Sequence, residues 1–341
     1  MRRLIKRVSW VLRERGEQGV SGVLVALMML VLIGVGAIAV DVGQIYSERA
    51  QLQNAADSGA LAVAQSCAAS ACDTSLADPL ADANSLDGKS TVSSVDTTSV
   101  AGQVTVKTTT KNGADNGSTL TKLFASALNV PAVSVGASAS AGLFPPSGGG
   151  AFPLAFSNKC WDLSSAVAAG VVQKISWKPG TTCTNASGHV VPGGWGWLSD
   201  PDADCYAVTT TGNIARTDPG NDKPAQCATI LQGWINTLNA GQDVKVTFPV
   251  YDTASGSGSG AVFHVLGYAT FRILGWKFGN NDVYEFRNTT AATGNSNLSC
   301  SGGGDRCIIG QFIKYVTTDD APSSNPAPGQ DFGTTEVKLI K

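Results

Sequence analysis

Few side chains in this sequence have the type and spacing that catalysis requires. The two histidines are His189, in a Gly-rich segment, and His264, within the alternating stretch VFHVLGY. A catalytic triad or a metal centre needs partners that converge on the histidine, and no GxSxG, HExxH or P-loop motif occurs to supply them. We therefore interpret both histidines as structural, and we predict no catalytic residue, no metal site and no cofactor.

Two further clusters have the residue types that bind ligands. Asp200, Asp202 and Asp204 alternate as the carboxylates of calcium loops do, but Cys205 and Thr211 occupy the places where such a loop has Gly and Glu. We interpret these carboxylates as a solvated acidic turn. Trp195 and Trp197 would share one face of an extended strand, where they either pack in a core or form an aromatic platform for a ligand.

The cysteines indicate disulfide chemistry. All eight lie between residues 67 and 307, and none forms a CxxC pair, so four disulfides in an oxidising compartment are favoured over a zinc site. The spacing suits local pairs of Cys67 with Cys72 and of Cys300 with Cys307. The other four allow three pairings, between which the sequence does not choose: Cys160, Cys183, Cys205 and Cys227.

The element that must position these residues begins with an uncharged run, Val20 to Val40, in which twelve of 21 residues are Leu, Ile or Val. A helix of that length spans roughly 30 Å, the thickness of the hydrocarbon core of a bilayer. Six Lys and Arg residues precede it within the first 15 positions. The positive-inside rule then places the N-terminus in the cytoplasm and residues 41–341 on the exported side, periplasmic or extracellular.

The alternative is a cleaved signal peptide, for which Ala37-Ile38-Ala39 offers a small-x-small site. The apolar run is longer than a usual signal, however, and the helical pattern continues beyond this site. Apolar and small positions recur at a spacing of three and four: Val42, Ile45, Tyr46, Leu52, Ala56, Gly59, Ala60 and Val63. Gln44, Glu48, Gln51, Asn54 and Asp57 then form the opposite, polar face. We predict one retained helix that continues to about Cys67.

Small residues at a spacing of four mark positions where this helix could meet another helix in the membrane. Gly22 with Ala26 and Ala39 with Gly43 have the spacing that allows close approach, although such pairs are common in Ala- and Gly-rich spans.

Beyond the helix the pattern changes to strands. Residues 90–95, 103–110 and 132–141 alternate with a period of two, and 120–128 suggests a short helix. After the break at 144–150, FPPSGGG, short strand-like runs recur at 171–177, 244–251, 261–274, 282–287, 308–316 and 335–340, with one helix at 225–238. The fold class is therefore α+β: a long helix with a small sheet, then a mainly antiparallel, disulfide-linked β domain. The net charge of −2 argues against nucleic acid as a partner.

The segment AIAVDVGQIYSERAQLQNAADSGALAVAQ, behind a basic start and a Gly-containing apolar span, resembles the N-terminal segment of TadG-like (TadE/TadG) proteins of Flp tight-adherence pilus assembly. The resemblance covers about Gly16 to Cys67. It implies a pilin-like, non-enzymatic envelope protein whose partners are membrane lipid and other pilus-assembly or pilin subunits. Larger relatives carry a DxSxS metal site, and the nearest match here, Asp162 to Ala166, lacks the last serine.

We therefore predict a cytoplasmic segment (1–19), a transmembrane helix (20–40), a pilin-like helix with a small sheet (41–143), a linker (144–150) and an exported β-rich domain (151–341). The predicted function is anchoring and protein–protein contact in Flp/Tad-type pilus assembly. The alternative is a membrane-anchored adhesin or ligand-binding module with its site at Trp195 and Trp197.

Overall fold

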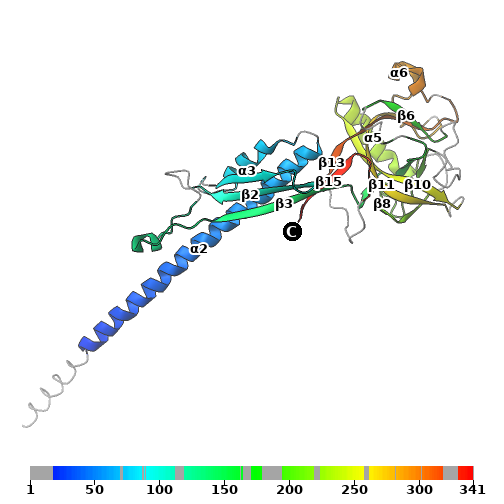
Figure 1. Cartoon of the computed structure of the whole chain (residues 1–341). Coiled ribbons are helices and arrows are strands. Elements are labelled where there is room, and N and C mark those ends of the chain that lie inside the picture. Colours follow the sequence, from blue (N-terminus) through cyan, green and yellow to red (C-terminus); the bar gives the residue numbers. More distant parts are fainter. Residues whose placement is uncertain are drawn as a thin grey trace, which may run out of the picture.

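One long helix, α2 (Gln18–Ala68), forms the N-terminal part of the computed structural model, as the sequence predicted. At 1.5 Å per residue its 51 residues extend about 75 Å. Its C-terminal half lies against a small sheet, and a larger β body lies beyond that sheet (Figure 1). The structure describes residues 18–69, 72–86, 88, 90–111, 119–161, 163, 170–178, 194–218, 223–256, 261–280, 282–300, 302–317 and 329–340.

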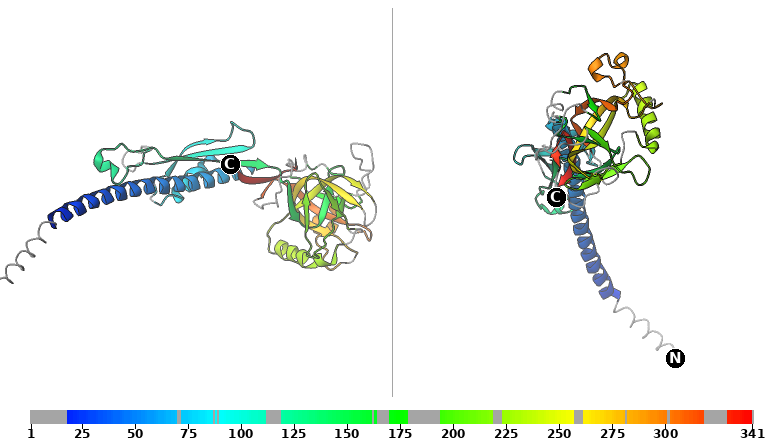
Figure 2. Two further views of the ribbon diagram at one scale, coloured as in Figure 1. Left: turned by 90° about the horizontal axis from the view of Figure 1, so that it is seen from below. Right: turned by 90° about the vertical axis from the view of Figure 1, so that its right-hand side faces the viewer.

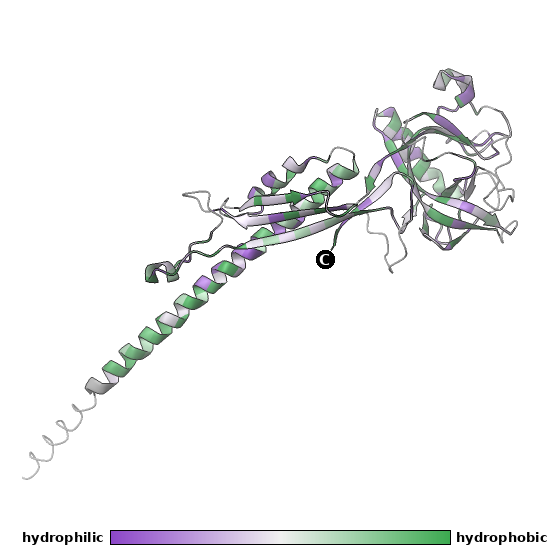
Figure 3. Ribbon diagram, viewed as in Figure 1, coloured by the Kyte–Doolittle hydropathy of each residue, from purple (hydrophilic) through white to green (hydrophobic). Residues whose placement is uncertain are grey.

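The N-terminal half of α2 is long and apolar enough to cross a membrane once. Its most apolar 18-residue stretch has a mean hydropathy of 3.0, and none of that stretch is buried within the molecule. Figure 3 shows it as a green rod that projects away from the sheets. The helix is thus compatible with single-pass membrane anchoring.

The small sheet has five strands in the order β1-β2-β3-β15-β13. β1 (Ser90–Asp96), β2 (Gln103–Thr110) and β3 (Gly136–Phe144) form an antiparallel meander. β15 (Thr334–Ile340) adds antiparallel to β3, and β13 (Tyr315–Thr317) adds parallel to β15. A short helical segment, η1 (Thr74–Leu76) with α3 (Ala77–Ala83), packs against α2 and against the edge strand β1.

The small sheet contains strands from both sides of the predicted linker at 144–150. β15 and β13 come from residues assigned to the second domain, yet they complete the first sheet. Part of the predicted linker is itself a strand, β4 (Gly148–Ala151), which pairs with β8 (Ala207–Thr210). Strand pairing between residues almost 200 positions apart leaves no local signal in composition, so the sequence did not indicate it.

The larger β body is built on an eight-stranded sheet that is mainly antiparallel. The order is β6-β12-β11-β10-β5-β7, and β9 and β14 pair with further parts of β11. The bounds are β5 (Leu154–Ser157), β6 (Gln173–Ser176), β7 (Trp195–Trp197), β9 (Ile214–Arg216), β10 (Val244–Ser255), β11 (Val262–Lys277), β12 (Cys307–Ile313) and β14 (Gln330–Asp331).

The core of the β body is rich in aromatic residues. Phe152, Phe156, Phe248, Phe271 and Phe312 contact one another, with ring centroids 4.6–6.3 Å apart and mostly tilted or edge-on. Helix α5 (Ala228–Asn239), preceded by η3 (Ala225–Cys227), adds residues such as Leu231 to this core. Figure 2 shows α5 on the outside of the body.

Two predicted elements differ from the structure. Residues 282–287 form a turn with one isolated bridge, Trp276 to Phe286, instead of a strand, and are followed by α6 (Thr290–Thr293) and η5 (Ser296–Leu298). Residues 120–128 contain an isolated bridge from Leu120 to Val133 and the 3-10 turn η2 (Ala125–Leu128), instead of an α-helix. Asn129 ends that turn in a left-handed conformation with φ 58°, and Pro131 follows, so the helix cannot continue.

Candidate functional site

The middle of α2 is hydrogen-bonded to a protruding arm, residues 119–135, which directly precedes β3 in the chain. Asp41 is 6% exposed, and its two carboxylate oxygens accept hydrogen bonds from the backbone N–H groups of Phe124 at 2.8 Å and Ala125 at 2.7 Å. One helical turn further, Gln44 accepts from the Leu123 N–H at 3.3 Å and donates to the Thr121 carbonyl at 3.3 Å. These bonds fix the arm beside residues 41–44 of the helix.

The covered face of α2 is polar between Asp41 and Glu48 and apolar from Leu52 onward. Asp41 and Glu48 are buried on it, and Glu48 Oε1 has no hydrogen-bond partner in the described part of the chain. Val42 and Tyr46, which the periodicity placed in the buried stripe, are instead 44% and 71% exposed. This part of the prediction was wrong, because an inward polar side chain with a backbone partner looks the same in sequence as a solvated one.

From Leu52 onward the buried face of α2 consists mostly of alanine. Ala56, Ala60 and Ala64 are 0% exposed and pack against a core that includes Val104, Val106, Ala141 and Val337 of the sheet. The Thr108 hydroxyl donates to the Leu52 carbonyl at 2.8 Å, which shows how near the strand lies to the helix backbone. Small side chains permit this short distance, so the sheet is held directly on the anchor helix.

The small-residue pairs predicted for contact between membrane helices lie on the uncovered surface of α2. Gly22, Ala26, Ala39 and Gly43 are all exposed, and a Cβ added at Gly22 or Gly43 would meet nothing within 4 Å. No contact within the described chain uses these positions, so their role in helix association stays a prediction.

The tryptophan pair forms no platform on the surface. β7 places Trp195 and Trp197 on one face, as predicted, but that face is the core: each is 1% exposed, and both contact Phe278 edge-on. On the opposite face, a Cβ at Gly196 would lie 2.6 Å from the Phe263 ring. Both faces of the strand are therefore covered, which removes the site on which the alternative function depended.

The histidines form no assembled catalytic centre among the described residues. His264 lies on β11, and its Nδ1 is 2.9 Å from Asp252 Oδ1 on the paired strand β10. Both side chains are partly exposed, and the same carboxylate oxygen also accepts from the Thr253 hydroxyl at 3.2 Å. His189 lies outside the described residues, as does Asp162 of the near-match to DxSxS.

Asp200 is the structural member of the acidic turn. It accepts from the Cys205 N–H at 2.7 Å, the Asp204 N–H at 3.3 Å and the Gln226 side chain at 3.0 Å. Burial raises the pKa of Asp200, but these hydrogen bonds outweigh burial and hold the pKa below its ordinary value. Asp202 and Asp204 are exposed, and among the described residues no three His, Cys, Asp or Glu side chains lie together as metal ligands would.

Disulfides link neighbouring segments of the chain that follows the apolar half of α2. Cys67 bonds to Cys72 at the end of α2, Cys205 bonds to Cys227 between the acidic turn and α5, and Cys300 bonds to Cys307 at the start of β12. The Cys205–Cys227 bond is one that the sequence alone left undecided. Cys160 is also disulfide-bonded, and Cys183 lies outside the described residues.

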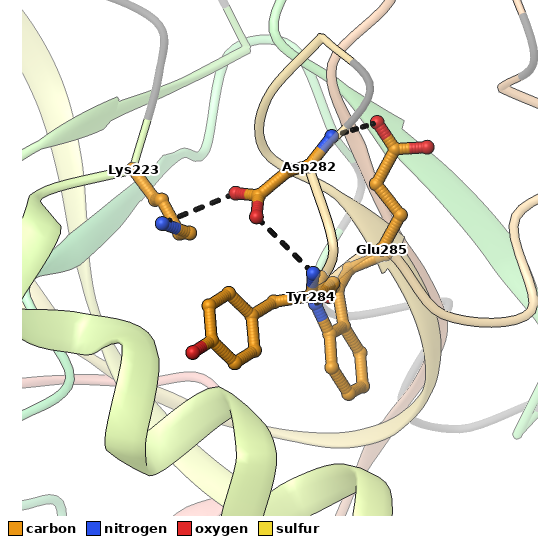
Figure 4. Close-up of polar contacts among 5 residues, drawn as sticks. Lys223, Asp282, Tyr284 and Glu285 are labelled. Atoms are coloured by element: carbon orange, nitrogen blue, oxygen red, sulfur yellow. Dashed lines mark hydrogen bonds and ion pairs between the residues drawn. The ribbon is translucent and has the colours of Figure 1, made fainter.

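One polar cluster had no signal in the sequence. Lys223 Nζ forms an ion pair with Asp282 at 3.2 Å and lies 5.2 Å from the centre of the Tyr284 ring (Figure 4). Asp282 also accepts from the Tyr284 N–H at 3.1 Å, and the Tyr284 carbonyl accepts from the Trp276 indole at 2.6 Å. The cluster connects the segment before α5 to the turn at 282–287, and we assign it a structural role.

Comparison with known proteins gives one match, and it falls on the helix described above. Residues 19–66 match the family model described as putative Flp pilus-assembly TadE/G-like. No curated protein and no solved structure matches the chain. The matched residues cover nearly all of α2, both the apolar rod and the alanine face, in agreement with the resemblance seen at Gly16 to Cys67. The N-terminal segment of this chain, residues 19–66, is therefore similar to the TadE/G-like Flp pilus-assembly family.

Proposed function

We propose that this protein is a non-enzymatic, membrane-anchored component of Flp/Tad-type pilus assembly, or a minor pilin-like subunit of the pilus. One observation carries the proposal: the family-matching segment is a single helix, uncovered and apolar in its first half and packed under a sheet in its second half. The first half of such a helix is suited to anchoring in a membrane, and the second half is suited to supporting the sheet.

The proposed orientation follows from charge and from the disulfides. Lys and Arg residues precede the apolar run, which places the N-terminus in the cytoplasm. The disulfides Cys67–Cys72, Cys205–Cys227 and Cys300–Cys307 all follow it, and disulfides persist in oxidising compartments. Both observations favour export of residues 41–341.

The proposed mechanism is positional. From Asp41 to Ala68 the helix rises about 40 Å, so the β body is held well away from the membrane surface. Within the membrane, the uncovered small residues at Gly22, Ala26, Ala39 and Gly43 would contact helices of other assembly proteins or pilins. The β body would then meet pilus subunits or the cell wall at a set height.

Deletion and complementation in a piliated parent strain test the proposal. We expect loss of pili by electron microscopy and loss of pilin from the sheared fraction, with recovery on expression of the full chain. A Gly43→Leu variant should recover fewer pili, because the added side chain blocks close helix approach, whereas Val42→Leu keeps a large apolar residue at a neighbouring exposed position. Normal piliation of the deletion strain would contradict the proposal.

A further inference from the structure

The arm, residues 119–135, exposes four large apolar side chains on one short segment, which is unusual for a loop in contact with water. Leu123 is 63% exposed, Phe124 46%, Leu128 80% and Val130 41%. Lys122 is the one charged residue in this stretch of the sequence. Exposed apolar side chains that gather on one segment mark a surface that is covered in the working protein.

The hydrogen bonds to α2 set the height of the arm relative to the membrane. Asp41 and Gln44 hold residues 121–125, and Asp41 is the first residue after the uncharged run that ends at Val40. At 1.5 Å per residue, Gln44 lies about 6 Å beyond Val40. The headgroup and acyl boundary, into which interfacial segments insert by about 5–10 Å, lies at that height.

The helix has matching apolar surface at this height. Val42 and Tyr46 are 44% and 71% exposed, so the apolar surface of the membrane-spanning half continues past Asp41 to the level of the arm. Tyrosine is enriched at membrane interfaces, where its ring is apolar and its hydroxyl reaches water. Figure 1 shows the arm, in green, extending beside α2 on the membrane side of the sheet.

We propose that the arm is a second membrane contact, which lies in the lipid interface of the same bilayer that α2 crosses. Leu123, Phe124, Leu128 and Val130 insert at the acyl boundary, and Lys122 faces anionic headgroups. The arm acts together with the helix to fix the tilt of the exported part. This inference rests on α2 spanning a membrane and is independent of any role in pili.

Photo-crosslinking in the full chain tests the contact in cell membranes. A benzophenone amino acid is placed at Leu128, at Leu30 in the span as positive control, and at Val283 in the β body as matched control, since Val283 is 84% exposed and Leu128 is 80% exposed. We expect lipid adducts by mass spectrometry at positions 30 and 128, with several-fold fewer at 283. Leu128 is the most exposed of the four apolar side chains named above, so a bulky probe at this position does not disturb the packing of the arm.

Three outcomes overturn the inference. Equal lipid labelling at positions 128 and 283 would show that the arm stays in water. Protein adducts in place of lipid at position 128 would show that another subunit covers the arm. Absence of lipid adducts at position 30 would remove the premise that α2 spans the membrane. An Asp41→Ala change should lower lipid labelling at 128 several-fold and leave labelling at 30 unchanged, because it releases the arm from the helix.

Discussion

Asp41 shows how a single carboxylate can join two parts of this chain. It lies one residue past the apolar run, is almost fully buried, and accepts two short backbone hydrogen bonds from the arm. A charge in such a place is stable only when hydrogen bonds replace the lost water, and the Phe124 and Ala125 N–H groups do so. Asp200 acts in a similar way in the β body, where it orders the turn that leads into Cys205.

The Asp41→Ala variant should loosen the arm without unfolding the helix. Hydrogen bonds to a charged group are worth about 1.5–3 kcal/mol, so loss of this carboxylate should raise amide exchange at Phe124 and Ala125 on the order of 30-fold. Hydrogen–deuterium exchange of the full chain in nanodiscs measures this change. Asp57→Ala is the control, because Asp57 accepts from the neighbouring Gln53 side chain on its own helix. Unchanged exchange in the arm would show that Asp41 does not hold it.

The sequence could not place Asp41 or Glu48 on the buried face. Periodicity assigns polar residues to solvent, and the partners of Asp41 are backbone groups 83 and 84 positions away. For Trp195 and Trp197 the sequence predicted the shared face of the strand but not whether that face is buried. Alternation correctly placed them on one face, but the covering of that face by Phe278 and Phe152 comes from distant segments.

At the scale of elements, the alanine face of α2 and the strands over it depend on each other. The helix and β2 match their predicted bounds closely because both are long and strongly periodic. Residues 120–128 and 282–287 were assigned wrongly because they are short, and turn residues and distant bridges decide their conformation. The alanines matter because larger side chains at those positions would increase the distance between the sheet and α2 and disrupt their packing.

Ala60→Leu should therefore destabilise the small sheet by overpacking. Ala60 is 0% exposed within the helix–sheet core, and extra methylene groups in a well-packed core cost about 1–3 kcal/mol. Ala50→Leu is the matched control on the exposed side of the same helix. Chemical unfolding in detergent, followed by limited proteolysis of residues 90–144, should show a lower midpoint for Ala60→Leu. Equal midpoints for the two variants would contradict the proposed packing.

The Cys205–Cys227 disulfide should stabilise the β body by closing a loop between the acidic turn and α5. Chain-entropy arguments for a sequence separation of 22 give about 3 kcal/mol. The double variant Cys205→Ser with Cys227→Ser should lower the thermal midpoint of the β body measured by tryptophan fluorescence. The Cys67→Ser with Cys72→Ser variant, whose separation is 5, serves as comparison and should change that midpoint little. A larger effect from the shorter loop would overturn this ranking.

At the scale of the whole molecule, the chain passes more than once between the small sheet and the β body. Lys314 connects β12 to β13, and residues 332–333 connect β14 to β15. Residues 145–147 connect β3 to β4, which pairs with β8 in a separate two-stranded sheet and is followed by β5. Phe332 packs in the core of the β body, and the Thr334 hydroxyl lies 2.8 Å from that of Thr270 on β11. No local pattern could have predicted this return of the C-terminus to the first sheet.

Truncation after Gly333 should disrupt the small sheet although it removes only the last strand. β15 separates β3 from β13, and its Val337 is buried against the alanine face of α2. We expect residues 90–144 to become sensitive to protease while residues 223–313 stay resistant. Removal of Lys341 alone is the control, since that residue follows β15. Full protease resistance of residues 90–144 after truncation would show that β15 is dispensable for the small sheet.

The short connectors also determine how tension would pass through the protein. A force that pulls on the β body would reach the small sheet through the neighbouring strands β3, β15 and β13, all at the same end of the sheet. β3 and β15 would therefore be pulled in the same direction. Their mutual hydrogen bonds would carry little shear, and the strain would fall on the contacts with β2 and α2. Because three separate connections resist twisting better than one would, a torque applied to the β body would also rotate the small sheet and α2.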